Sequence, residues 1–259
     1  MNTDTWKTLK PQESCWYCWH LLGAKAYLRK NKEQWQTAFE TIPFQERSAD
    51  YGGPFIGEGP GQEAPITGTW GEGMLATLRP YFSTKPYFVT VKERTRLLNG
   101  ITVSFSVDLP PVLKFELPGD IVLAQAMPFS VSATWFGTDT TAGILCHSLP
   151  GALVPLGDTP LPAAPVPLIR SMITIKNHSK TTLDLDHLVI YPKQLAVYEQ
   201  NGHLFSSILN LDFPGSSLRV DIPRAHDPNW NLLTPGVKSD LGELIVQWGI
   251  GMIKNLTQL

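Results

Sequence analysis

The stretch FSVSATWFGTDTTAGILC, residues 129–146, decides the fold that we expect for this chain. In its first half, apolar side chains alternate with serine and threonine at the two-residue period of a half-buried strand. The apolar set is Phe129, Val131, Ala133 and Trp135, so a strand ending at Trp135 is predicted. Gly137 and Gly143 then bracket short polar residues that favour turns, before an apolar run resumes. The stretch predicts two strands with a loop between them, and it carries no recognisable catalytic set.

The same alternation continues on both sides of this stretch. Upstream, residues 87–117 show three alternating runs, separated by the turn dipeptide Asn99-Gly100 and by Pro110-Pro111, and we expect three antiparallel strands. Downstream, the segments predicted as strands are Met172–Lys176, Leu183–Tyr191, Leu195–Tyr198, Leu204–Phe213 and Leu218–Ile222. Turns at intervals of about 8–12 residues are typical of sandwiches. We therefore predict an all-β chain folded as an antiparallel β-sandwich, immunoglobulin-like or related.

The N-terminal part is predicted to be a Trp-rich β-hairpin. Two apolar segments within residues 15–41 flank a charged tip, as in a hairpin with a solvated turn. Residues 43–73 are dense in glycine and proline, and we expect a long irregular loop there. The tryptophans Trp16, Trp19 and Trp35 have two interpretations, which are packing inside a core and stacking against a sugar or another small ligand.

Proline and glycine divide the rest of the chain. Six prolines within residues 150–167 predict an extended connection. The predicted parts are the N-terminal β-hairpin region with its loop (1–82), a first sandwich part (83–149), the Pro-rich connection (150–167) and a second sandwich part with a C-terminal tail (168–259). In the tail, interior glycines and β-branched residues favour a strand through about Trp248, followed by a short amphipathic helix.

Composition limits the possible classes of function. The 259 residues carry 21 basic and 23 acidic side chains, a formal charge of -2, so there is no basic surplus for binding nucleic acid. No apolar run reaches the ~18 residues of a membrane-spanning helix, and the N-terminus has no signal-peptide pattern. We therefore expect a cytoplasmic protein that has no transmembrane segment, has reduced thiols, and is peripheral to a membrane only through a partner.

Residue types that serve catalysis or metal binding are present, but not in a working pattern. Cys15-x-x-Cys18 lacks a second knuckle and Cys146 stands apart, so neither a metal site nor a cofactor is predicted. No HxH, HExxH, GxSxG, GxGxxG or P-loop pattern occurs. The types in Ser132, Asp139 and His147 match a hydrolase triad, which is the weakest of the functional hypotheses. We therefore predict that the protein is not an enzyme.

Most of the chain resembles a known family, and the specific part of the resemblance is the stretch around Thr134–Gly137. The motif is Ser132-x-Thr134-Trp135-Phe136-Gly137-x-x-Thr140-x-x-Gly143-x-Leu145-Cys146, followed downstream by Ile173-x-Ile175-x-Asn177-x-Ser179 and Leu183-x-Leu185-x-x-Leu188. It is similar to the family called domain of unknown function 432, which occurs in archaea and bacteria. The resemblance implies no established activity. It does imply an accessory role beside small-conductance mechanosensitive channels, an association that carries no physical warrant by itself.

Two function classes follow from these observations. The first is a non-enzymatic interaction protein that binds a protein partner, such as the soluble region of a mechanosensitive channel, through a turn-rich loop and the apolar C-terminal tail. The loop residues are Thr134, Trp135, Phe136, Gly137, Asp139, Thr140 and Gly143. The alternative is a carbohydrate- or small-ligand-binding module that stacks its ligand on exposed tryptophans among Trp16, Trp19, Trp35 and Trp135.

Overall fold

The structure, a computed structural model, describes residues 5–21, 23–42, 52–57, 59–71, 74–137, 142–157, 167–215, 219–222 and 229–237, and the backbone of 246–248. Within these residues, every regular element is a β-strand except one 3-10 turn, η1 (Pro192–Gln194). The all-β prediction is therefore confirmed. The same residues include no helix with the length and apolar content needed to cross a membrane.

The N-terminal strands form a five-stranded antiparallel sheet. Its members are β1 (Trp16–Leu21), β2 (Ala24–Asn31), β3 (Gln34–Thr41), β4 (Gly52–Gly57) and β5 (Ile66–Thr69), in the order β4-β1-β2-β3-β5. The predicted charged tip is the turn between β2 and β3, where Lys32 has a left-handed φ of 54°. The first arm of the predicted hairpin is instead two strands, because the chain reverses at Gly23 with a φ of 83°. The predicted irregular loop is also wrong in part, since it contains β4 and β5.

A three-stranded antiparallel sheet packs on this first sheet. It consists of β6 (Thr77–Tyr81), β9 (Val112–Leu117) and β10 (Ile121–Ala126), in the order β10-β9-β6. The two sheets share one hydrophobic core, in which the rings of Trp19 and Phe115 lie 5.2 Å apart. The pairing thus places residues 112–126, which the sequence assigned to the first sandwich part, beside the N-terminal strands.

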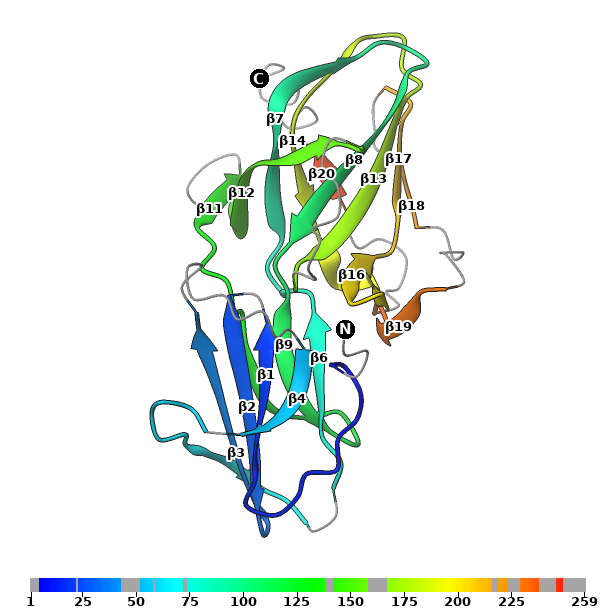
Figure 1. Ribbon diagram of the computed structural model, residues 1–259. Helices are drawn as coiled ribbons and strands as arrows, with labels where there is room; N and C mark the ends of the chain where they lie inside the picture. The colour runs from blue at the N-terminus through cyan, green and yellow to red at the C-terminus, as the bar shows by residue number, and fades with distance from the viewer. Residues whose placement is uncertain are drawn as a thin grey trace.

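The remaining twelve strands form one hydrogen-bonded array. They are β7 (Tyr87–Leu97), β8 (Thr102–Leu109), β11 (Ala133–Gly137), β12 (Gly143–Pro155), β13 (Ile169–Asn177), β14 (Leu183–Ile190), β15 (Val197–Gln200), β16 (His203–Ser206), β17 (Leu209–Phe213), β18 (Arg219–Asp221), β19 (Asn231–Thr234) and β20 (Val246–Trp248). Two halves of the array face each other across the larger core: β7 and β14 lie on one side, and β8, β13 and β17 lie on the other (Figure 1).

Strand β12 belongs to both halves of the array. Its middle pairs with β7 and its last residues pair with β8. The register shifts between Leu149 and Leu153, and Gly151 has a φ of 63° within the shifted segment, which lets the strand bend from one half into the other. The start of the predicted Pro-rich connection is therefore the end of a strand, and residues 158–166 lie outside the described part of the chain.

The strand positions predicted within 87–117 are confirmed, and in the described part of the chain these three strands do not pair with one another. The Asn99-Gly100 turn joins opposite halves of the array, and β9 pairs with β6 and β10 instead of β8. The array also contains three parallel pairs, β12 with β7, β13 with β16 and β13 with β17. Alternation identifies a strand, but it does not identify the strand's partner.

The two cores meet at a junction. Trp6 and Phe82 pack against a small cluster of Ile169, Val197 and Leu204. Two hydrogen bonds cross the same junction: Thr234 Oγ1 donates to the carbonyl of Pro80 at 2.8 Å, and Arg79 Nη1 donates to the carbonyl of Leu233 at 3.0 Å. At the other end of the molecule β20 pairs with β14, as expected for a strand ending at Trp248. The short helix expected after it falls on residues 249–259, which lie outside the described residues.

Candidate functional site

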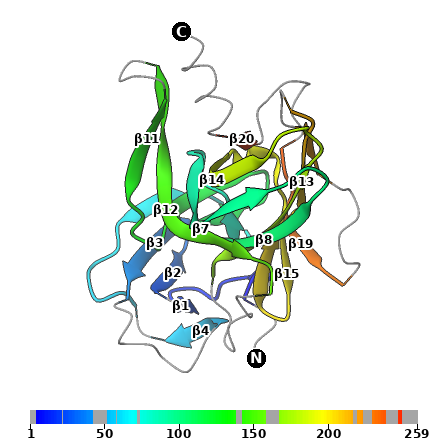
Figure 2. The same ribbon diagram turned by 90° about the horizontal axis from the view of Figure 1, so that it is seen from above.

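The predicted strand–loop–strand is a hairpin that projects from the body of the protein. Strands β11 and β12 pair from Ala133 opposite His147 to Gly137 opposite Gly143, and both views show the hairpin standing at one side of the molecule (Figures 1 and 2). The strand was predicted to end at Trp135, and it extends two residues further, to Gly137. Gly137 pairs with Gly143, and residues 138–141 of the predicted loop lie outside the described residues.

The two faces of the hairpin differ in burial. On the inner face, Phe136 and Cys146 are buried and pack with Val189. The Phe136 ring lies 5.7 Å from that of Phe88 on β7. The predicted apolar face is therefore the wrong one, since Trp135 points outward and is 48% exposed.

The outer face presents two large apolar side chains together. Trp135 lies directly opposite Leu145 in the pairing, so the two share this face, and Leu145 is 44% exposed. A Cβ atom on Gly143 would lie 2.7 Å from the indole Nε1 of Trp135, so the ring rests on the glycine backbone. A Cβ on Gly137 would lie 2.2 Å from the carbonyl oxygen of Ala142. Both glycines are therefore needed for the close approach of the two strands.

The structure brings most of the predicted loop residues together, but not on one surface. Trp135, Gly137 and Gly143 are exposed, Thr134 is half-buried, and Phe136 anchors the hairpin to the body. Asp139 and Thr140 lie outside the described residues. We call the outward surface formed by Trp135 and Leu145 the hairpin face.

The N-terminal tryptophans do not form a stacking platform. Trp19 and Trp35 are 1% and 0% exposed, because both belong to the core between the two N-terminal sheets. Trp16 is half-buried, and the guanidinium of Arg29 lies 4.9 Å from the centre of its ring. Two of the three predicted stacking residues are therefore unavailable to a ligand, and the core interpretation holds for them.

The three cysteines are free thiols, of which Cys18 and Cys146 are buried and Cys15 is half-buried. Burial raises the pKa of the Cys18 thiol to about 11, and burial also raises that of Cys146, so neither is a ready nucleophile at neutral pH. Among the described residues, no three His, Cys, Asp or Glu side chains are grouped as metal ligands.

His147 has a partner that the sequence did not predict. Its Nε2 lies 2.8 Å from Ser83 Oγ, at the start of the segment that leads from β6 into β7. Ser83 Oγ accepts the backbone N–H of Lys85, so its own hydrogen can be donated to a neutral His147. Desolvation and the charge of Lys85 lower the pKa of His147, consistent with that neutral form. The Ser132 carbonyl accepts the N–H of Ser148, and Asp139 lies outside the described residues, so the described geometry does not support the triad hypothesis.

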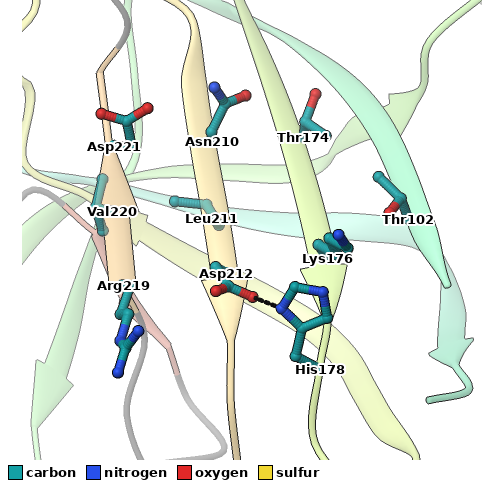
Figure 3. A pocket seen from close by; sticks show the side chains of 10 residues that line it. All are labelled: Thr102, Thr174, Lys176, His178, Asn210, Leu211, Asp212, Arg219, Val220 and Asp221. Atoms are coloured by element: carbon teal, nitrogen blue, oxygen red, sulfur yellow. Dashed lines mark ion pairs between the residues drawn. The ribbon is translucent and has the colours of Figure 1, made fainter. Parts of the chain in front are cut away.

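A second candidate site lies on the outer surface of the opposite half of the array. It is an open groove of about 450 Å³ over β8, β13, β17 and β18 (Figure 3). Its lining residues are Thr102, Thr174, Lys176, His178, Asn210, Leu211, Asp212, Arg219, Val220 and Asp221. His178 Nδ1 lies 2.7 Å from Asp212 Oδ1, within ion-pair distance but without hydrogen-bond geometry. We call this site the outer groove.

Sequence reasoning missed the outer groove. The sequence did contain polar residues at alternate positions of the two strands. These are Thr174 and Lys176 on β13, and Asn210 and Asp212 on β17. The two strands are parallel neighbours separated by more than thirty positions, so their side chains come together only through a pairing that alternation does not reveal.

Packed β-sheets and a projecting hairpin define the class of this protein, a strand-rich protein with two hydrophobic cores. The chain belongs to the family described as Protein of unknown function (DUF432), whose sequence profile matches residues 6–240. This confirms the resemblance carried by the Thr134–Gly137 motif and its downstream companions. Searches of curated proteins and of solved structures found no match to the chain.

Proposed function

We propose that this protein is a non-enzymatic interaction protein that binds a protein partner through the hairpin face. The observation that carries the proposal is the exposed pair of Trp135 and Leu145 on a hairpin whose other side is anchored in the body. Tryptophan is among the residues that contribute most to protein–protein affinity. A large indole exposed beside a leucine adds little to folding, and such apolar patches are typical of interaction sites.

In this proposal the rest of the molecule is a scaffold that presents the hairpin face. We regard the larger array as an immunoglobulin-like or related sandwich, a scaffold class that carries recognition on the hairpins and loops at its edges. The family resemblance makes the soluble region of a small-conductance mechanosensitive channel the first partner to test. The alternative of ligand stacking on tryptophans loses support, because Trp19 and Trp35 lie in a core.

The proposal is tested by comparing surface variants in a pull-down. The double variant W135S/L145S removes the hairpin face without altering the buried Phe136 and Cys146. The matched control is Ile66→Ser, which removes an aliphatic side chain that is 54% exposed on β5. Tagged wild-type and variant proteins are incubated with detergent-solubilised membranes and with the purified soluble region of the channel.

The expected result is retention of a defined partner by wild-type protein and by I66S, with an affinity that W135S/L145S lowers by about tenfold or more. Retention of the same partner by W135S/L145S at wild-type affinity would contradict the proposal. So would the absence of any partner retained by wild-type protein.

A further inference from the structure

The outer groove carries two exposed cations, Lys176 and Arg219. Within the part of the chain that the structure describes, neither side chain forms a hydrogen bond or an ion pair. They flank Asp212 across three neighbouring strands, in one row of the pairing. The nearby His178 faces the Asp212 carboxylate, as Figure 3 shows. This row therefore has an excess of positive charge.

The adjacent row has the opposite character. Thr174, Asn210 and Asp221 are register partners two residues along the strands from Lys176, Asp212 and Arg219. This second row holds one carboxylate and two neutral hydrogen-bonding side chains, so its charge is negative. Asp221, like the two cations, has no side-chain partner among the described residues. The groove thus has a positive row and a negative row, separated by roughly 7 Å along the strands.

We propose that the outer groove binds a small aliphatic zwitterion, with its carboxylate between Lys176 and Arg219 and its ammonium group at Asp221. The two cations outnumber the one Asp212 carboxylate that lies between them in the pairing, so a further carboxylate can accept charge-assisted hydrogen bonds from both. The Asp221 carboxylate, which has no side-chain partner among the described residues, suits an ammonium group. A ligand that carries only one charge satisfies one row and faces unfavourable charge in the other. This site is independent of the hairpin face, which lies at the other side of the molecule (Figures 1 and 2).

The test uses three probes of similar length and different charge: 4-aminobutanoate, butanoate and butylammonium. Each is titrated into the full-length, isotope-labelled protein, and binding is measured from shifts of backbone amide resonances. We expect 4-aminobutanoate to bind about tenfold more tightly than either single-charge probe, because it makes charge-assisted contacts in both rows and each single-charge probe makes them in one row. The shifted amides should belong to β13, β17 and β18.

Variants separate the two rows. R219Q and K176Q should each weaken 4-aminobutanoate and butanoate while leaving butylammonium unchanged, and D221N should weaken 4-aminobutanoate and butylammonium while leaving butanoate unchanged. The matched control is Lys92→Gln, which removes an exposed lysine from β7 in the other half of the array and should change no affinity. Unchanged amide dispersion in each spectrum shows that the variant is folded.

Three results would overturn the proposal. They are the absence of localised shifts at millimolar probe concentrations, equal binding of all three probes, and binding of 4-aminobutanoate that D221N or R219Q leaves unaffected. The variant W135S/L145S should bind 4-aminobutanoate as wild-type protein does, so failure of the groove and failure of the hairpin face are distinguishable.

Discussion

At the scale of single residues, one buried amide, that of Asn177, holds together parts of the chain that are distant in sequence. The fully buried Asn177 donates to the carbonyls of Leu97 and Thr181 at 2.8 and 2.9 Å, and it accepts the N–H of Ser179 at 2.9 Å. This one amide ties the end of β7 to the turn after β13. The motif in the sequence pointed to Asn177 and Ser179, but their role depends on the carbonyl of Leu97, eighty positions away.

The pairing of His147 with Ser83 predicts a pH dependence of stability. The lowered pKa of His147 means that the folded protein resists a proton that the unfolded chain takes up near 6.5. Stability from this group is therefore complete above pH 6.5 and is lost as pH falls below it. We expect the free energy of unfolding, measured with urea from about pH 8 to about pH 5, to fall less in H147Q than in wild-type protein. Identical pH profiles would show that the neutral state of His147 does not matter.

Two expectations from the sequence disagreed about Trp135: the alternation placed it on the apolar face of a strand, whereas the loop hypothesis required it to be exposed, and it is exposed. The alternation of Phe129, Val131, Ala133 and Trp135 predicted a common buried face, but only the last two lie in the paired strand. The inner position is taken by Phe136, which finds Phe88 and His187 on other strands. An alternation of apolar residues gives the two faces of a strand, and only tertiary packing decides which face is covered.

At the scale of elements, the hairpin depends on its glycines, and this leads to a stability prediction. In G137A the new methyl group would meet the backbone of Ala142 and Gly143, which cannot move without opening the hairpin. We expect the free energy of unfolding to fall by about 1–3 kcal/mol. The matched control is Gly57→Ala at the end of β4, where a Cβ meets no atom within 4 Å, and it should be close to neutral. Equal effects of the two substitutions in urea unfolding would contradict this description of the hairpin.

Much of the element-scale organisation was predictable. The turn at Asn99-Gly100 is where the sequence placed it, and the two glycines that were predicted to bracket a loop, Gly137 and Gly143, pair with each other. The turn at Gly23 was missed, because the apolar residues on both sides continue without a polar break. The strands inside 43–73 were missed because glycine and proline there mark edge strands, with Pro54 inside β4.

At the scale of the whole molecule, the chain passes between its two cores more than once, so the cores depend on each other. Strands β9 and β10 complete the N-terminal core, while β7 and β8 before them in sequence and β12 after them contribute to the larger core. The sequence predicted four consecutive parts, and its pattern of alternation and breaks contained no information on this interleaving. Pairing between segments distant in sequence is decided by complementary surfaces, which a single sequence does not display.

Because the two cores contact each other at the junction, we expect them to unfold together. In T234V the hydroxyl that donates to the carbonyl of Pro80 is lost, and that carbonyl is left inside the junction. We expect the free energy of unfolding to fall by about 1–2 kcal/mol, with the heat-absorption peak of both cores shifting together. The control is Thr95→Val, whose hydroxyl donates only to the nearby carbonyl of Glu93. A shift confined to one of two separate peaks would contradict the dependence of one core on the other.

The hairpin face is the surface through which we propose that the protein binds its partner. The most direct measurement replaces Trp135 with benzoylphenylalanine in the full-length protein, irradiates the cells that produce it, and identifies the crosslinked product by mass spectrometry. The same replacement at Ile66, exposed on β5, serves as the control. The account predicts one defined protein adduct from position 135 and none of that mass from position 66. An adduct equally abundant from both positions, or none from position 135, would contradict it.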